Sequence, residues 1–466
     1  MVMELNPLVT IYITNYNYGN YIKEAIESVL NQTFKDIELI IIDDGSTDNS
    51  KEIIESYSSF KNIRIIFQKN KGLNVTNNIA MRLAHGKYLV RLDADDYFSP
   101  DAIEKMSHKL ESDNKLGLVF PDYYLIDSMG ETIAKKQRHA FDTDVSLLDQ
   151  PAHGACTMIR HSYLEKMGGY NESFSCQDGY DLWIRFTAKY RVANINEPLF
   201  FYRQHESNLT KNEDRILNTR AEIKESFVNS ENIKPPKTLG ILPIRGEKVN
   251  RYSLAFEKFG DQYLIDTKIK AAIHANNLDL LVVTSPDLKI KNHVNDNYSN
   301  EKVIFIERPK NLAQINKDLK DSVEYILKDD KLKSYVFDSF LLMFLEYPFV
   351  TSNIIDDAIQ TMAIFNLDSL ISVRQDNSLF YNHDGKGMKA INDQDKFTRI
   401  EREAIYKFTA GLMMTKIDLF KSKNSFIGDR AGHIEVNQQA ALGLYSDFDV
   451  KLAKMIAAQE LKLIKG

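Results

Sequence analysis

The stretch Val9-Thr-Ile-Tyr-Ile-Thr-Asn-Tyr-Asn17 begins as a β-rich run and ends in polar residues. The same order returns twice, in Ile37-Glu-Leu-Ile-Ile-Ile-Asp-Asp-Gly45 and in Lys87-Tyr-Leu-Val-Arg-Leu-Asp-Ala-Asp-Asp96. Segments with helical spacing of apolar residues separate these runs. Strands that alternate with helices imply right-handed crossovers, so this region predicts an α/β fold with a mostly parallel sheet.

A second region of alternating strands and helices begins after Asn232-Ile-Lys-Pro-Pro-Lys237. The preceding residues, 211–231, are charged and have helical periodicity, and a Pro-Pro pair cannot continue a helix. Strand and helix patterns then run from Thr238 to a last helix near the C-terminus. We predict two tandem α/β domains with mostly parallel sheets, residues 1–210 and 238–466, joined by a helical linker at 211–237.

Composition narrows the class of protein. The 466 residues include 59 Lys and Arg against 65 Asp and Glu, a formal net charge of −6 that argues against a nucleic-acid partner bound through bulk charge. Two cysteines, Cys156 and Cys176, are too few for a disulfide framework and are expected to be buried thiols. The N-terminal residues predict no signal peptide, and the most apolar window, around Phe340, is too short for a transmembrane segment. We therefore expect a cytoplasmic protein, with peripheral membrane association as a further option.

Polar clusters follow three strands of the first domain. Ligands of open parallel sheets bind beyond the carboxyl ends of the strands, where these clusters are expected. Asp93 and Asp95 are two residues apart at a strand end, so their carboxylates project to one side and suit Mg²⁺ or Mn²⁺ holding a diphosphate. Tyr16 beside Asp44 could stack on a nucleobase and hydrogen-bond to it. The alternative is that both acidic clusters are only surface turns or helix caps.

Several motifs together resemble family 2 glycosyltransferases. They are Val9–Asn17, Ala25-Ile-Glu-Ser-Val-Leu-Asn-Gln-Thr33, Glu38–Asp48, Gly86–Asp96, Gly168-Gly-Tyr-Asn-Glu172, Gln177-Asp-Gly-Tyr-Asp-Leu-Trp-Ile-Arg185 and Phe201-Tyr-Arg-Gln-His205. They occur in the family's order over residues 7–210. The resemblance implies a GT-A fold and an inverting, metal-dependent sugar transfer from a nucleotide sugar.

The resemblance also implies roles for single residues. Asp178 would be the general base, although Gln177 replaces an acidic residue that many members carry, and Glu172 and Asp181 remain rival bases. Asp95 and His205 would hold the metal, with Arg203 closing over the diphosphate. The nucleoside would be held by Thr14, Tyr16, Asp44 and Asp93. Trp183 is expected in the core.

The second domain resembles acylneuraminate cytidylyltransferases. The likeness rests on Leu239-Gly-Ile-Leu-Pro-Ile-Arg245, Lys258–Ile265, Val303–Pro309 and Phe426–Arg430. The sequence differs from that family at positions that serve catalysis. Glu247 follows the first motif, and Gly443 and Tyr445 stand where two aspartates are expected. We therefore expect a fold that has lost its catalysis, in which Arg245, Lys248 and Arg251 bind an anionic sugar or phosphate, or a module for homo-oligomer formation.

Three functions remain open on the sequence. The first is a glycosyltransferase of surface polysaccharide or glycoconjugate synthesis, with a UDP-sugar as the expected donor and a glycan or lipid-linked acceptor. The second is a bifunctional enzyme that also makes a CMP-sugar. The third is a non-catalytic scaffold that binds sugar nucleotides.

Overall fold

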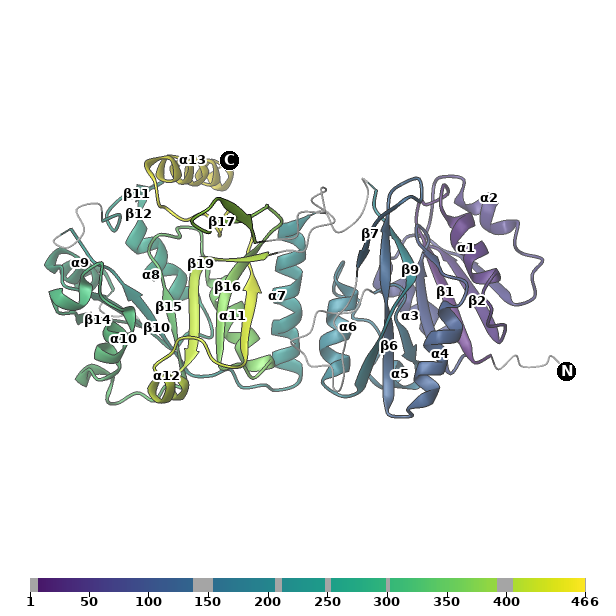
Figure 1. Cartoon of the computed structure of the whole chain (residues 1–466), viewed down its shortest axis with the longest axis horizontal. Helices are drawn as coiled ribbons and strands as arrows, with labels where there is room; N and C mark the ends of the chain where they lie inside the picture. The colour runs from purple at the N-terminus through teal and green to yellow at the C-terminus, as the bar shows by residue number, and fades with distance from the viewer. Residues whose placement is uncertain are drawn as a thin grey trace. The chain divides into compact units, whose positions relative to one another are not determined.

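The computed structural model describes residues 7–136, 154–205, 212–247, 253–298, 302–391 and 405–465. The chain divides into two compact units, Met1–Ile223 with Ser378–Glu403 and Lys224–Asn377 with Ala404–Gly466 (Figure 1). The division falls inside one helix, α7 (Glu213–Ser230), in the region where the sequence predicts a helical linker.

The first unit is built on a mixed sheet. Its described strands follow the order β3-β2-β1-β4-β8-β6-β9-β5, with β7 paired to β6. The strands are β1 (Val9–Asn15), β2 (Ile37–Asp43), β3 (Ile63–Phe67), β4 (Tyr88–Asp93), β5 (Tyr97–Phe98), β6 (Leu116–Ile126), β7 (Thr132–Lys136), β8 (Met158–Arg160) and β9 (Arg191–Arg203). The helices are α1 (Ile22–Leu30), α2 (Ser50–Glu55), α3 (Leu73–Leu83), α4 (Ala102–Ser112), α5 (His161–Lys166) and α6 (Asp178–Thr187). A hairpin of β17 (Tyr381–His383) and β18 (Met388–Ala390) also belongs to this unit.

The prediction of a mostly parallel sheet is correct for one half of this sheet, whereas the other half is mixed, with β6 and β9 parallel and β5, β7 and β8 antiparallel to their neighbours. Strands β3, β2, β1 and β4 are parallel, and helices connect them as predicted. Beyond β4, strand β8 runs antiparallel to both of its neighbours. Strand β7 is likewise antiparallel to its neighbour β6.

The second unit has a sheet of seven described strands in the order β14-β13-β10-β15-β19-β16-β20, parallel except where β19 pairs with β15 and β16. The strands are β10 (Thr238–Pro243), β13 (Leu280–Ser285), β14 (Val303–Glu307), β15 (Ser339–Met343), β16 (Ser369–Asp376), β19 (Ile405–Lys416) and β20 (Ala431–Glu435), beside a small hairpin of β11 (Lys258–Phe259) and β12 (Gln262–Tyr263). The helices are α8 (Leu264–His274), α9 (Leu288–Tyr298), α10 (Leu319–Leu327), α11 (Ser352–Ile364), α12 (Ile417–Lys423) and α13 (Asp447–Lys465), with short 3₁₀ turns η2 (Lys310–Ala313) and η3 (Asp330–Leu332).

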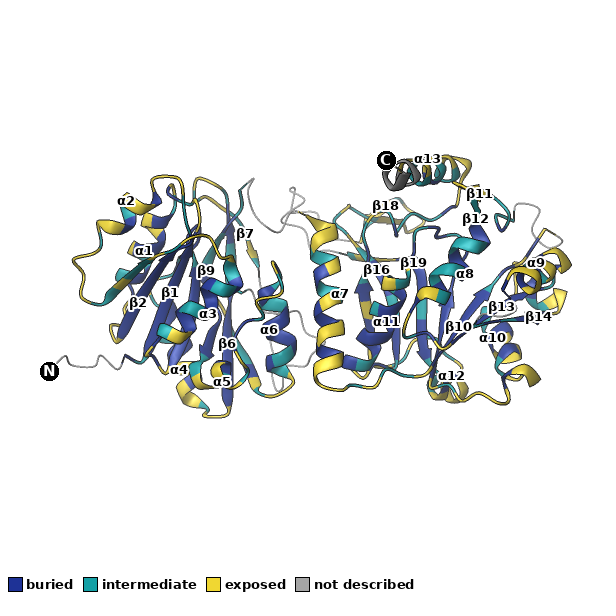
Figure 2. Cartoon of the chain, turned by 180° about the vertical axis from the view of Figure 1, so that it is seen from behind, coloured by how far each residue is buried: buried dark blue, intermediate teal, exposed yellow. Residues whose placement is uncertain are grey.

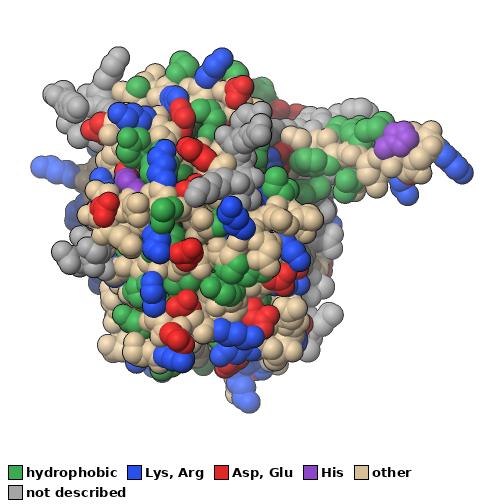
Figure 3. Space-filling model, turned by 90° about the vertical axis from the view of Figure 1, so that its left-hand side faces the viewer, with side chains coloured by type: hydrophobic (Ala, Val, Ile, Leu, Met, Phe, Trp, Pro, Cys, Tyr) green, Lys and Arg blue, Asp and Glu red, His purple; other side chains and the backbone are tan. Residues whose placement is uncertain are grey.

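In both units the central strands are buried and the helices expose one face to solvent (Figure 2). Every residue of β1 and β2 is buried, as expected for parallel strands covered on both faces. Helix α1 buries Ile22, Ala25 and Val29, which follow the helical period seen in the sequence. The face drawn in Figure 3 intersperses basic and acidic side chains among apolar ones. Among the described helices, none is both long and apolar enough to cross a membrane.

Candidate active site

The candidate site of the first unit lies at the carboxyl ends of three adjacent parallel strands. The register pairs Thr14 of β1 with Asp93 of β4, and Asn15 of β1 with Asp43 of β2. The predicted polar clusters therefore do meet at one sheet edge. The Thr14 hydroxyl donates to Asp93 Oδ1 over 3.4 Å, and Asn15 Nδ2 donates to Asp43 Oδ1 over 2.7 Å.

His205 and Asp95 come together from distant parts of the chain. The imidazole Nε2 lies 2.8 Å from Asp95 Oδ2, and both side chains are buried. The His205 ring stacks on Tyr21 with ring centres 5.6 Å apart and meets Tyr18 edge-on at 5.5 Å. These aromatic contacts fix the imidazole beside the carboxylate.

Asp95 and His205 together could supply two ligands of a divalent metal ion, whose other ligands would come from elsewhere. Imidazole nitrogen and carboxylate oxygen are both accepted by Mn²⁺, and carboxylate oxygen by Mg²⁺. The described residues contain no group of three or more His, Cys, Asp and Glu side chains that could hold a metal. A metal bound by Asp95 and His205 would therefore need diphosphate oxygens and water to complete its coordination, as Mg²⁺ usually does.

Arg91 connects the site to helix α6. It stands in β4, fully buried, and its Nε lies 2.9 Å from Asp93 Oδ1. Its Nη1 forms a buried ion pair with Asp178 Oδ2. Asp178, the predicted base, is the first residue of α6, and the ion pair with Arg91 holds it beside β4, the strand that ends at Asp93.

The rival bases have other partners. Asp181 forms an ion pair with Arg185, one turn along α6, and Arg185 also donates to the carbonyl oxygens of Met167 and Gly169. Glu172 accepts a hydrogen bond from Asn78. Asp178 is therefore the acid of this group that Arg91 joins to Asp93 of β4.

Burial alters the ionisation of the aspartates on this edge. Desolvation, with a smaller contribution from Asp95, raises the pKa of Asp93 to about 6 although Arg91 pulls it down. Desolvation also raises the pKa of Asp96 well above its usual value, against the hydrogen bond that it accepts from the Arg203 amide. A cation brought to this edge would relieve the repulsion between the carboxylates.

Asp44 and Tyr16 occupy different environments. The Asp44 carboxylate is buried and accepts hydrogen bonds from the amides of Lys71 and Gly72 and from Gln68, so it organises the loop before α3. Tyr16 is 47% exposed and its ring is open to a ligand. Turn formation, the alternative interpretation of this acidic cluster, is visible in Asp43, which accepts from the backbone and hydroxyl of Ser46.

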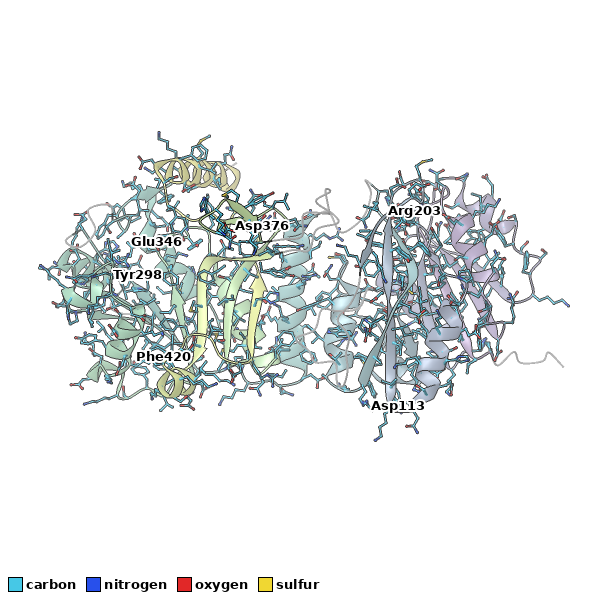
Figure 4. The ribbon with its side chains drawn as sticks, in the orientation of Figure 1. Asp113, Arg203, Tyr298, Glu346, Asp376 and Phe420 are labelled. Atoms are coloured by element: carbon cyan, nitrogen blue, oxygen red, sulfur yellow. The ribbon has the colours of Figure 1, made fainter. Side chains whose placement is uncertain are left out.

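Arg203, labelled in Figure 4, makes several contacts within the protein. Its Nε donates to the carbonyl oxygen of Asp95 over 2.8 Å, its Nη2 pairs with Glu24, and its guanidinium lies 4.8 Å from the centre of the Tyr21 ring. It is 2% exposed. These contacts favour a role in positioning the Asp95 loop over a direct contact with diphosphate.

The remaining candidate residues are placed as follows. Trp183 is buried against Phe120, and both free cysteines are buried, as predicted. Arg245 is exposed at the end of β10 in the second unit. Lys248 and Arg251 lie outside the described residues.

The sequence analysis missed Arg91 and Gly154. Arg91 shares one side of β4 with Asp93, a signal available from the period of two. A side chain at Gly154 would place its Cβ 2.7 Å from Arg91 Nη2 and 3.1 Å from Asp178 Oδ2, so glycine is needed for the ion pair to form there. Nothing local to residue 154 predicts that approach.

Comparisons with known proteins match the N-terminal part of the chain to a glycosyltransferase family. Residues 10–168 match the glycosyl transferase family 2 model. An uncharacterized glycosyltransferase of Methanocaldococcus jannaschii is 35% identical over 215 residues, which cover 44% of this chain and 73% of that protein. Chondroitin synthase of Escherichia coli is 35% identical over 192 residues, 41% of this chain and 28% of the synthase.

The match is partial in both directions. The chain spans 28% of the E. coli synthase and 66% of a Rickettsia prowazekii glycosyltransferase to which it is 35% identical. A solved structure of S. aureus TarS residues 1–349 with UDP-GlcNAc aligns over 47% of this chain and 66% of that one, at 18% identity and a TM-score of 0.41. The sequence matches, together with the acidic edge of the first sheet, show that the chain belongs to glycosyltransferase family 2.

Proposed function

We propose that the first unit is an inverting, metal-dependent glycosyltransferase that takes its sugar from a nucleotide sugar, with a UDP-sugar as the first donor to test. The observation that carries this proposal is the meeting of Asp93, Asp95, His205 and Asp178 around one sheet edge. The likeness to glycosyltransferases supports a sugar acceptor, such as a growing glycan or a lipid-linked sugar of a surface polysaccharide.

In the proposed reaction Asp178 removes the proton of the acceptor hydroxyl. That oxygen then bonds to the anomeric carbon while the bond from this carbon to the diphosphate breaks, so the diphosphate leaves with the electron pair. Asp178 Oδ2 is engaged by Arg91, and Oδ1 has no hydrogen-bond donor among the described residues, so Oδ1 is the oxygen that accepts the proton. A correctly held base of this kind contributes about two to four orders of magnitude in rate.

Asp93 and Thr14 are assigned to the ribose, and Tyr16 with Asp44 to the nucleobase. Asp95 and His205 would hold Mg²⁺ or Mn²⁺, which when bound would neutralise the leaving diphosphate. Arg91 orients Asp178 and, through Asp93, ties the base to the donor side of the site. Arg203 positions the Asp95 loop.

For the second unit we propose a cytidylyltransferase-like domain, residues 238–466, without its ancestral catalysis. The support is local: Tyr445, which stands where a metal-binding aspartate is expected, is hydrogen-bonded through its hydroxyl to Tyr347 over 2.7 Å. Synthesis of a CMP-sugar remains the alternative, and release of pyrophosphate from CTP and a sugar acid would establish it.

The proposed transfer is tested with a set of nucleotide sugars and Mn²⁺. Binding of the correct donor should raise the melting temperature, because a ligand of the native state stabilises it. The same donor should release its nucleotide when an acceptor sugar is added, and EDTA should abolish that release. If the donor stabilises the chain but no acceptor or water ever releases the nucleotide, the transferase proposal is wrong and a sugar-nucleotide-binding scaffold is favoured.

A further inference from the structure

The second unit contains a cavity of about 540 Å³ at the carboxyl ends of its parallel strands. Its wall is formed by residues that directly follow β10, β14 and β15, together with α10 and the segment before α13; its polar and charged members include Arg245, Ser253, Arg308, Gln314, Lys317, Ser322, Glu346 and Tyr445. All belong to one compact unit. The volume is in the range of sites that bind small molecules.

Arg308 is the buried charge of this cavity. Its side chain comes from the residue after β14 and is 3% exposed. Nη1 donates to the Ser322 hydroxyl over 3.1 Å and Nη2 to the Ile244 carbonyl oxygen over 3.2 Å, while Nε has no hydrogen-bond partner. No described carboxylate forms an ion pair with it. Burial and the nearby Arg245 lower the pKa of Arg308 to about 10, which still leaves the guanidinium charged at neutral pH.

An unpaired buried guanidinium is costly, since its lost hydration is not repaid by an opposite charge. Two further cations, Arg245 and Lys317, line the same cavity from its exposed side, and neither forms an ion pair with a described carboxylate. The three cations face one acid, Glu346, which is labelled in Figure 4. This excess of positive charge matches a dianionic group, and arginine favours phosphate because its donors are arranged as a fork.

We propose that the cavity binds the phosphate of a small phosphomonoester, a sugar phosphate or a nucleoside monophosphate, and does so without a metal ion. Arg308 and Arg245 hold the phosphate, and Glu346 accepts hydrogen bonds from hydroxyls of the attached sugar. A metal-bound triphosphate fits these residues less well, because Glu346 is the single carboxylate among the described residues of the cavity wall and a cation of that kind needs several oxygen ligands. The site is separate from the proposed transfer machinery, so either proposal can fail without the other.

The test is calorimetric titration of the full chain. Three probes, inorganic phosphate, glucose 1-phosphate and CMP, are each titrated with and without EDTA. The fourth probe is CTP with Mg²⁺. We expect a phosphomonoester to bind unchanged in EDTA, and the tighter of glucose 1-phosphate and CMP identifies which molecule carries the phosphate. Arg308→Met should weaken that binding by about tenfold or more, the loss expected for a charge-assisted hydrogen-bonding group.

Control variants separate binding in this cavity from other effects. Arg374→Met removes an arginine of β16 that does not line the cavity, and this variant should bind the phosphomonoester as the unmodified chain does. If Arg308→Met does not fold, Arg245→Ala and Lys317→Ala, which are surface changes, should each weaken binding by about two- to fivefold. The proposal would be overturned if the variants of Arg308, Arg245 and Lys317 bound the phosphomonoester as the unmodified chain does, or if no monoester bound at all. Binding of CTP with Mg²⁺ followed by pyrophosphate release would also overturn it.

Discussion

Arg91 joins two acids that belong to different sides of the proposed reaction. It is fully buried, so its ion pairs with Asp93 and Asp178 act in a medium where charges interact far more strongly than in water. Removing one member of such a buried network leaves the others uncompensated. The orientation of Asp178 is therefore expected to depend on a strand residue that need not touch the substrate.

The assignment of the base is tested by Asp178→Asn. The amide has nearly the same shape but cannot accept a proton at neutral pH, so kcat should fall by about two to four orders of magnitude while donor binding changes little. Steady-state kinetics with the best donor, together with a donor titration, measure both. The matched control is Asp181→Asn, which breaks the ion pair with Arg185. This variant should have a lower melting temperature, and its kcat should stay close to that of the unmodified chain. The reverse result would assign the base to Asp181.

The metal assignment is tested by Asp95→Ala. Because Asp95 is a strand-end residue and not part of the apolar core, the variant should keep its fold while losing transfer and the dependence of donor binding on Mn²⁺. Circular dichroism and a Mn²⁺ titration of donor binding distinguish these effects. Turnover close to that of the unmodified chain, with Mn²⁺ present, would contradict the assignment.

Helix α8 contains an unusual charge. Lys268 is fully buried on it and its Nζ has no hydrogen-bond partner, so desolvation lowers the pKa of this lysine from 10.5 to about 7, with Glu346 opposing the shift. Between these two values the unfolded chain binds the proton and the folded chain does not, so stability rises as the pH increases from 7 towards 10. At and below pH 7 the full cost of burying the ammonium remains.

Lys268→Met should therefore raise the free energy of unfolding by an amount on the order of a few kcal/mol at pH 7, with a gain that shrinks as the pH approaches 10. Denaturant unfolding of the second-unit transition across this pH range measures it. Lys270→Met on the same helix is the control, because Lys270 is only partly buried and donates to Gln262; its effect should stay within about 0.5 kcal/mol at every pH. A pH-independent gain in Lys268→Met would show that the ammonium is not desolvated.

The elements that could be predicted from the sequence are those with a local signal. The strands β1, β2 and β4 and the helices between them follow from apolar runs and helical periodicity, and the meeting of Thr14 with Asp93 follows from parallel pairing. Strand β8 and its antiparallel pairing have no such signal, because three residues show no period. The ion pair of Arg91 with Asp178 joins positions 87 apart in sequence, so only the fold could reveal it.

For the chain as a whole, the two-unit division makes a truncation informative. A chain ending near Lys234 should fold and retain transfer, because every residue proposed for the reaction lies at or before His205 and the first sheet has its own buried core. It would lack the hairpin β17–β18, which belongs to the first unit. Thermal unfolding and nucleotide release are the measurements. A truncated chain that is insoluble or inactive would show that residues after 234 complete the first unit.

The two cysteines have a practical consequence for studying that division. Cys156 and Cys176 are the only thiols of the 466-residue sequence, and both are buried, at 1% and 8% exposure. Burial raises the pKa of the Cys156 thiol well above its usual value, and reaction with maleimides requires a thiolate that is accessible. A cysteine introduced on the surface of each unit would therefore be labelled selectively in the native protein, with the natural thiols left in place. Spin labels or a fluorophore pair at such positions would then measure how the distance between the units responds to a nucleotide sugar.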